Sequence, residues 1–226
     1  MKILVVIADT DEFIPFKKSV APMITEEGVF HKMPMLKFTF KNCEATVICT
    51  GMGKVNASCG TALALAEKKY DLVINTGWSG AVTKLLKGDI VAGSSCVECD
   101  FDLTPIGYKP AQKSKDGEYI YETDKMLLEK VAAIPGFKTA KLGTGDFFLT
   151  DKAKSDYYLE LFGISAFDME SGAIASACRL LDAPFISVRK ISDSADDAAG
   201  DTYRESLVSD DTAFSEIVIK VLDAVL

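Results

Sequence analysis

The chain has 226 residues, of which 48% are hydrophobic and 26% are charged, and its formal net charge is −8. This composition is typical of a globular protein with a substantial core, and the acidic balance without any dense run of Lys or Arg argues against a nucleic-acid partner. No stretch approaches the roughly 20 apolar residues of a membrane span, and Met1–Ala8 is too short for a secretion signal. We therefore expect one domain over residues 1–226, in the cytoplasm and without a membrane partner.

The spacing of apolar residues and the residues that flank them predict the elements of the first half of the chain. Runs of β-forming residues indicate strands, and apolar residues three or four apart indicate a helix. In chain order these elements are a strand at Lys2–Ala8, hairpin strands at Met35–Phe40 and Cys43–Thr50, a helix at Val55–Lys69, and a strand at Asp71–Thr76 that stops at Gly77.

The same signals continue through the second half. Residues Asp100–Asp116, which contain Pro105, Gly107 and Pro110, predict a long loop between two elements. The other elements, in chain order, are a β-rich segment at Asp89–Cys99, a helix at Asp124–Ala133 capped by Thr123 or Asp124, a strand at Thr139–Thr144, a helix opened by Thr150 or Asp151, a helix at Glu170–Leu181, a strand at Pro184–Ile191 and an amphipathic helix at Ser209–Leu226.

Strands and helices thus alternate from end to end. This order predicts an α/β fold, a single domain whose central sheet is mixed, mostly parallel and twisted, with helices on its flanks. No linker, internal repeat or low-complexity tract divides the chain.

The six cysteines are dispersed through apolar stretches and are interpreted as small buried side chains. Cys96 and Cys99 have C-x-x-C spacing, but no second pair completes a zinc site, and His31 is the only histidine. Cys96 lies among β-forming residues and not at the start of a helix, where a redox motif is expected. We therefore expect no metal and no cofactor.

Acids, glycines and aromatic residues collect where predicted strands end, and in α/β folds ligands bind at these ends. The segments lack histidine, a Cys–His pair, a G-x-S-x-G elbow and a P-loop, so nucleophilic acyl transfer has little support. Two carboxylates can share the cleavage of a glycosidic bond, because one protonates the leaving group while the other orients a water. The segments are Ala8–Glu12, Asn75–Gly80, Gly143–Phe148, Phe167–Gly172 and Ile191–Asp196.

Read as an ordered series, the motifs of the chain resemble the 5′-methylthioadenosine/S-adenosylhomocysteine nucleosidases of the nucleoside phosphorylase superfamily. The resemblance covers nearly the whole chain, and its specificity comes from the order and spacing of the pieces. The matching motifs are Gly51–Ala57, Asn75–Ala81, Gly88–Val91, Thr144–Phe148, Asp168–Ser171 and Val188–Asp193.

The resemblance implies a role for each matched residue. Asp193 corresponds to the general acid that faces the purine and donates a proton to N7, for which its pKa must be raised or its proton gained through the substrate. Glu12 corresponds to the acid that positions the attacking water. Glu170 matches the residue that holds the ribose hydroxyls, Met169 packs under the sugar, and Phe148 stacks on the purine.

Further residues of the matched motifs are expected at the substrate site. The backbone of Leu149 addresses the purine edge, and Arg189 is either a substrate ligand or a structural ion-pair partner. Leu103 and Ile106 look like the apolar residues that a neighbouring subunit contributes to the pocket around the 5′ substituent, which implies a homodimer. Ser192, Ser79 and Met52 complete the set.

The motifs favour hydrolysis over phosphorolysis. A phosphorylase holds a dianion with arginines and backbone amides. Here the turn after the first strand is acidic, and Asn75-Thr76-Gly77 is not preceded by Arg. A phosphate-dependent purine nucleoside phosphorylase is the alternative enzyme, and phosphate dependence discriminates the two.

Two residues depart from the family pattern. Trp78 lies where a small hydroxyl residue supports the purine-facing acid, and Asp9 replaces an apolar residue beside the 5′-alkylthio group. An unpaired buried charge is costly, so Asp9 predicts a preferred 5′ substituent other than methylthio.

Two classes other than an active glycosidase stay open. Trp78 keeps open a nucleoside-binding protein without turnover. A dinucleotide-binding fold has little support, because Gly51-Met52-Gly53 is followed by Asn56 where the G-x-G-x-x-G pattern needs glycine.

Overall fold

The computed structural model describes residues 1–117, 119–196, 199–209 and 213–226. The strands are β1 Lys2–Ile7, β2 Ile24–Phe30, β3 Met33–Phe40, β4 Cys43–Cys49, β5 Leu72–Ala81, β6 Ile90–Glu98, β7 Ile120–Glu122, β8 Phe137–Thr144, β9 Ala166–Asp168 and β10 Phe185–Asp193. The helices are α1 Thr10–Val20, α2 Lys54–Glu67, α3 Lys125–Ala132, α4 Lys152–Phe162, α5 Ser171–Leu180, α6 Ala199–Ser209 and α7 Ala213–Val225, with 3-10 turns η1 Ala21–Met23 and η2 Thr104–Ile106.

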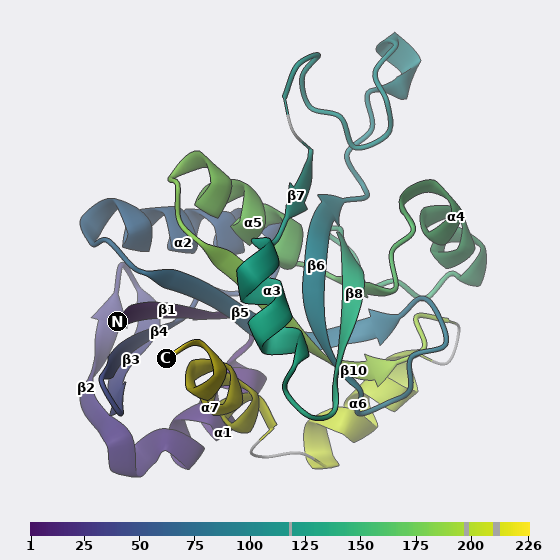
Figure 1. Cartoon of the computed structure of the whole chain (residues 1–226). Helices are drawn as coiled ribbons and strands as arrows, with labels where there is room; N and C mark the ends of the chain where they lie inside the picture. Colours follow the sequence, from purple (N-terminus) through teal and green to yellow (C-terminus); the bar gives the residue numbers. More distant parts are fainter. Residues whose placement is uncertain (118, 197–198, 210–212) are drawn as a thin grey trace.

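One ten-stranded sheet carries all of these strands, in the order β10-β6-β8-β9-β5-β1-β4-β3-β2, with β7 paired to β6 (Figure 1). Because β10 also pairs with β5, the strands β5, β10, β6, β8 and β9 close into a ring. The expected mixed sheet in a single α/β domain is confirmed. Its pairings divide equally into five parallel and five antiparallel ones, so the parallel share is smaller than expected.

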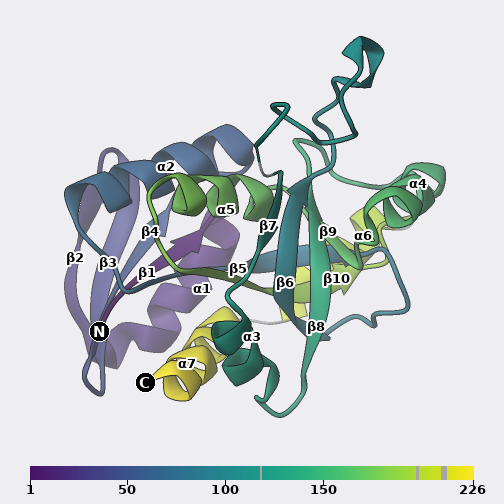
Figure 2. The ribbon, with the colours of Figure 1, turned by 45° about the horizontal axis from the view of Figure 1, so that its top comes forward.

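Helices cover both faces of the sheet (Figure 2). Along β1, Ile3, Val5 and Ile7 face a core shared with α1 and α7, while Leu4 and Val6 face a second core shared with α2 and α5. Successive side chains of a strand point to opposite faces, so a strand buried on both sides must be apolar throughout. This is why the continuous apolar run at the N-terminus predicts β1 correctly.

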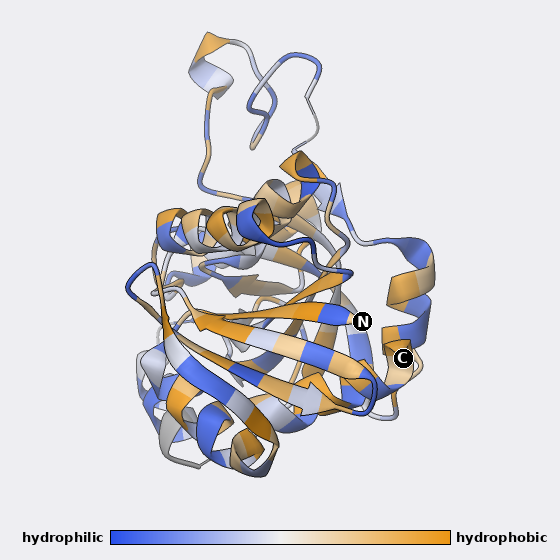
Figure 3. Cartoon of the chain, turned by 90° about the vertical axis from the view of Figure 1, so that its left-hand side faces the viewer, coloured by the Kyte–Doolittle hydropathy of each residue, from blue (hydrophilic) through white to orange (hydrophobic). Residues whose placement is uncertain are grey.

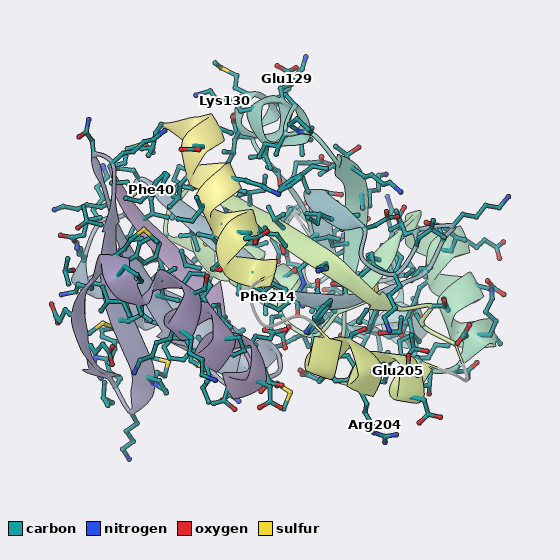
Figure 4. All side chains as sticks on the ribbon, turned by 90° about the horizontal axis from the view of Figure 1, so that it is seen from below. Phe40, Glu129, Lys130, Arg204, Glu205 and Phe214 are labelled. Atoms are coloured by element: carbon teal, nitrogen blue, oxygen red, sulfur yellow. The ribbon has the colours of Figure 1, made fainter. Side chains whose placement is uncertain are left out.

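The C-terminal helix α7 lies under the centre of the sheet (Figure 4). Its buried residues Phe214, Ile217, Val218, Val221 and Leu222 recur every three or four positions, as an amphipathic helix requires. Figure 4 also shows Arg204 and Glu205 of α6 pointing away from the body of the protein. The predicted helix Ser209–Leu226 is too long at its start, because Ser209 ends α6, and residues 210–212 lie outside the described residues.

The outer edge of the sheet is the antiparallel meander β2-β3-β4 (Figure 3). Buried and more exposed residues alternate along β3, so that Leu36 and Phe38 reach the core. The predicted hairpin is confirmed, and its Lys-Asn turn places Lys41 at φ 51°. The sequence predicts no element between Ala8 and Met35, where the structure has α1, η1 and β2.

The strand predicted to stop at Gly77 continues to Ala81. Residues Gly77 to Gly80 pair with β10, and Gly80 and Ala81 also pair with β9. Glycine at position 77 is required by close approach, because a Cβ there would lie 2.9 Å from Glu12 Oε1 and 3.0 Å from Arg189 Nη1. The absence of a side chain at Gly77 therefore leaves the space that the carboxyl group of Glu12 and the guanidinium of Arg189 occupy.

A long segment between β6 and β7 projects from the body of the protein and carries η2 at its tip (Figures 1 and 2). The predicted loop over Asp100–Asp116 is confirmed apart from this short turn. Within the described part of the chain, no helix combines the length and apolar character that crossing a membrane requires.

Candidate active site

The main pocket opens where the parallel strands β1, β5 and β10 end, beside the turns that lead into α2, α4 and α5. It holds about 140 Å³ of space and is open to solvent at its mouth, and polar and aromatic side chains converge on it, as in a small-molecule site. Its lining residues are Ala8, Asp9, Glu12, Met52, Trp78, Ser79, Gly80, Phe147, Phe148, Leu149, Phe167, Asp168, Met169, Glu170, Arg189, Ser192, Asp193 and Tyr203.

Glu12 reaches the pocket from the first turn of α1. Its side chain is buried, and Oε1 accepts the backbone N–H of Trp78 at 2.9 Å. Burial raises the pKa of Glu12 to about 8, against the opposing effects of Arg189 and of the Trp78 hydrogen bond. A carboxyl group with this pKa can exchange a proton near neutral pH, as a general base or acid requires.

Asp193 ends β10, on the far side of β5 from β1. Its Oδ2 accepts the hydroxyl of Ser192 at 2.6 Å, and its Oδ1 accepts the N–H of Ala195 at 2.9 Å. Burial raises the pKa of Asp193, although both hydrogen bonds oppose that shift. The carboxyl group is therefore held in one orientation and retains a proton more readily than an exposed aspartate.

Glu170 precedes α5 and lies between a backbone amide and an arginine. Its Oε1 accepts the N–H of Gly53 at 3.1 Å, and its Oε2 lies 3.4 Å from Nη2 of Arg189. Burial raises its pKa, while Arg189 lowers it. Asp168 fixes the backbone of this segment, because Oδ1 accepts the N–H groups of Glu170 and Ser171 at 2.9 and 2.8 Å.

Arg189 is fully engaged in holding the floor of the pocket. Nε donates to Ser79 Oγ at 2.9 Å, Nη1 donates to Asn75 Oδ1 at 3.1 Å, and Nη2 donates to the carbonyl of Trp78 and to Glu170. The nearby carboxylates raise its pKa despite burial, so the guanidinium stays charged. The structure thus shows Arg189 as an ion-pair partner that also lines the pocket.

Aromatic and apolar side chains form the rest of the wall. Phe148 is 44% exposed at the mouth, and its ring lies 5.4 Å from that of Tyr203. Leu149 is buried behind it, Met169 is half-buried, and Met52 is exposed at the rim. A flat apolar ligand could therefore be held between these side chains and the carboxyl groups.

Trp78 and Asp9, the two departures from the family pattern, both line the pocket. The Trp78 indole packs 5.0 Å from the ring of Phe214, within the core beneath the sheet. Asp9 is the N-cap of α1, where Oδ1 accepts the N–H of Asp11 at 3.0 Å. Each residue therefore has a structural role beside its place in the lining.

The chain matches a family model and curated relatives along most of its length. The model of the phosphorylase superfamily matches residues 2–226. A 5′-methylthioadenosine/S-adenosylhomocysteine nucleosidase of Exiguobacterium sp. is 33% identical over 188 residues, which cover 80% of each chain. The corresponding protein of Geobacillus kaustophilus is 31% identical over 206 residues, or 87% of each chain. The chain belongs to this nucleosidase family of the phosphorylase superfamily.

A solved structure of a member of the family has the same fold. The S-adenosylhomocysteine nucleosidase of Streptococcus pyogenes, in complex with 5-methylthiotubericidin, superposes with a TM-score of 0.90 and 26% identity. The match covers 100% of this chain and 98% of that one. The membership expected from the ordered motifs is confirmed.

The pocket brings together twelve of the fourteen residues expected at a nucleosidase site. Leu103 and Ile106 lie outside it, at η2 on the projecting segment, where Ile106 is 70% exposed. The twelve residues in the lining are Asp9, Glu12, Met52, Trp78, Ser79, Phe148, Leu149, Met169, Glu170, Arg189, Ser192 and Asp193.

Some lining residues were not singled out from the sequence. Tyr203 comes from α6, an element that the sequence does not predict. Phe147 and Phe167 also line the pocket, and the centroids of their rings lie 5.2 Å apart. Asp168 and Phe147 lie inside the matched motifs Asp168–Ser171 and Thr144–Phe148, so their place beside predicted site residues is a signal that they line the pocket. Tyr203 has no such signal, because nothing in its local sequence relates it to Phe148.

The cysteines and acids of the described residues form no metal-binding cluster of three or more. All six cysteines are free, and burial raises the pKa of both Cys96 and Cys99. The C-x-x-C pair is thus two buried thiols on and just beyond β6.

Proposed function

We propose that this protein hydrolyses the N-glycosidic bond of a purine nucleoside, as its relatives named 5′-methylthioadenosine/S-adenosylhomocysteine nucleosidase do, and releases the free base and a ribose derivative. The observation that carries the proposal is a pair of buried carboxyl groups in one pocket, Glu12 from the first turn of α1 and Asp193 from the end of β10. In both, burial raises the pKa.

Asp193 protonates the leaving base. Proton donation to purine N7 makes the base a neutral leaving group, and the raised pKa keeps the proton available. Ser192 holds the carboxyl group through its hydroxyl at 2.6 Å. Phe148 stacks on the base, and the backbone of Leu149 addresses its edge.

Glu12 and Glu170 act on the sugar. As the glycosidic bond breaks, the ribose gains positive charge, and nearby carboxylates stabilise that charge. Glu170 holds the ribose hydroxyls, with Met169 beneath the ring. Glu12, once ionised, positions the water that attacks the anomeric carbon. Trp78 orients Glu12 through its backbone N–H.

Water is favoured over phosphate as the acceptor. The lining contains five carboxyl groups, those of Asp9, Glu12, Asp168, Glu170 and Asp193, and one cation, Arg189. All three nitrogens of that guanidinium donate to protein oxygens. A phosphate dianion would meet net repulsion at this site without a free arginine to hold it.

Base release from purified protein tests the proposal. Adenine should appear from methylthioadenosine, S-adenosylhomocysteine or adenosine, or hypoxanthine from inosine, and Asp193→Asn should lower the rate by about 10²–10⁴-fold without lowering Tm. Binding without release from any of the four nucleosides would instead identify a nucleoside-binding protein. Release that Asp193→Asn leaves unchanged would remove Asp193 from the reaction.

The protein is further proposed to act as a homodimer. Support comes from the projecting segment, whose tip presents the exposed side chain of Ile106 and the half-buried Leu103 away from their own pocket. Such a segment can contribute apolar side chains to the pocket of a second copy. Ile106→Glu should shift the mass in analytical ultracentrifugation from dimer to monomer, whereas a monomeric wild type would refute the assignment.

A cytoplasmic location is proposed as well. Support comes from the six free cysteines, five of them buried, because disulfides are rare in a reducing compartment. Fractionation of cells that express the full chain should recover it with cytoplasmic markers, and recovery with an exported fraction would contradict the assignment.

A further inference from the structure

The strands that end at the pocket place Asp9 at the opposite end from Asp193. β10, β5 and β1 are consecutive parallel neighbours, so the strand that ends at Asp193 and the strand that leads to Asp9 are two strand spacings, or roughly 10 Å, apart. β4, which leads to Met52, is the next strand beyond β1. A nucleoside whose base meets Asp193 and whose ribose meets Glu170 must therefore direct its 5′ end toward Asp9 and Met52.

The Asp9 carboxylate has one oxygen available to a ligand. Its Oδ1 accepts the N–H of Asp11 at 3.0 Å and the hydroxyl of Thr10 at 3.4 Å. No hydrogen bond to Oδ2 is present among the described residues, and no lysine lines the pocket. The cap bond on Oδ1 holds Asp9 in place. Oδ2 is therefore available to a ligand that enters the pocket.

Tyr203 also lines the pocket. Its phenol is half-buried and its ring is held against Phe148 at 5.4 Å. Burial, together with the carboxylates of Glu12, Asp9 and Asp11, raises the pKa of Tyr203, so the phenol keeps its proton. The pocket thus offers the carboxylate of Asp9 and the phenol of Tyr203.

Building on the proposed nucleosidase activity, we propose that Asp9 makes this a site for nucleosides whose 5′ substituent donates hydrogen bonds, with a 5′-ammonium group favoured over a 5′-methylthio group. A methylthio group would remove water from Asp9 and return no hydrogen bond to it. An ammonium group replaces that water with a charge-assisted hydrogen bond. The difference in binding is expected to be about 10- to 100-fold.

The test compares 5′-amino-5′-deoxyadenosine, adenosine and 5′-methylthioadenosine on the full-length protein. Dissociation constants are measured in the Asp193→Asn background, so that the result does not depend on turnover. The amine should bind about 10- to 100-fold more tightly than the thioether, with adenosine between them.

Asp9→Asn is the decisive second variant. Asparagine still caps α1 through its side-chain oxygen but carries no charge, so the helix is kept while the preference for the amine should fall at least 10-fold, by about the strength of one charge-assisted bond. Asp11→Asn is the matched control, because Asp11 is exposed and outside the lining, and it should leave the amine-to-thioether ratio unchanged.

Three results would overturn the inference: tighter binding of the thioether, an amine preference that survives Asp9→Asn, or no binding of any of the three nucleosides. Failure of the proposed function is a separate result. It would appear as binding with the expected order while wild-type protein releases no adenine.

Discussion

Glu12 Oε1 accepts the backbone N–H of Trp78 at 2.9 Å and so links the start of α1 to the middle of β5. Asp9 and Glu12 have the spacing of a capping box, in which the glutamate would fold back on its own helix. Here Asp9 caps the helix, while the carboxyl group of Glu12 crosses to β5 beside the pocket. Because Asp9 caps α1, the side chain of Glu12 is free to reach the pocket.

Glu12→Gln should stabilise the protein at alkaline pH while abolishing base release. The pKa of Glu12 is about 8 in the folded protein against 4.5 for an ordinary glutamate, so its contribution to stability is lost as pH rises from the lower value to the higher. Glutamine can still accept the Trp78 N–H and never ionises. The variant should gain about 1–4 kcal/mol over wild type at pH 9 and little at pH 4, measured by denaturant unfolding. An equal gain at both pH values would contradict the assigned pKa.

The value of kcat/KM should rise with pH toward about 8. Glu12 must lose its proton to orient the water, and its pKa in the free enzyme is about 8. The pH profile with a good substrate would show an acidic limb near that value. A profile flat from pH 6 to pH 9 would remove Glu12 as the base.

Gly77→Ala should impair catalysis more than folding. A Cβ at this position would lie 2.9 Å from Glu12 Oε1 and 3.0 Å from Arg189 Nη1, so both side chains must shift. Displacement of a catalytic group by a few tenths of an ångström to 1 Å lowers kcat by about 10- to 100-fold. Gly200→Ala in α6 is the control, because its Cβ would meet no atom within 4 Å. Wild-type kcat for Gly77→Ala would show that Glu12 is not held where the reaction needs it.

Asp168→Asn should destabilise the protein and raise KM. Asp168 accepts hydrogen bonds from Thr144, Glu170 and Ser171, and its Oδ2 lies 3.7 Å from Arg189 Nε. Removing one charge of a buried pair costs about 3–5 kcal/mol. The exposed pair between Lys152 and Asp156 provides the comparison, and Asp156→Asn should change stability by less than about 1 kcal/mol. Similar Tm values for Asp168→Asn and Asp156→Asn would show that the buried pair contributes no more to stability than the exposed pair does.

The sequence predicts the long periodic elements well. β1, the β3–β4 hairpin, α2 and α5 follow from apolar runs that only a core position explains, and Asp124 and Asp151 cap α3 and α4 as expected. Short strands are missed because three residues, as in β7 and β9, carry no periodicity. The helix α1 is missed because Pro15 lies inside it, although Asp9, Glu12 and the acidic first turn signal a helix start.

The candidate site is predictable where the motifs of the family are continuous in sequence. The pairings that assemble it are not. Asn75 Oδ1 accepts hydrogen bonds from Ser171 of α5 and from Ser187 and Arg189 of β10, and no local pattern relates these residues. Likewise Tyr203 reaches Phe148 only because α6 packs against β10 across the mouth of the pocket.

The acceptor of the ribosyl group is the central question, and one measurement answers it directly. Adenine release from methylthioadenosine or adenosine is followed in phosphate-free buffer and again after phosphate is added, with the sugar product identified by mass spectrometry. The acidic pocket and the engaged Arg189 predict the same rate in both buffers and a free pentose derivative as the product. A rate that requires phosphate, with a pentose 1-phosphate as the product, would contradict hydrolysis and make this protein a phosphorylase.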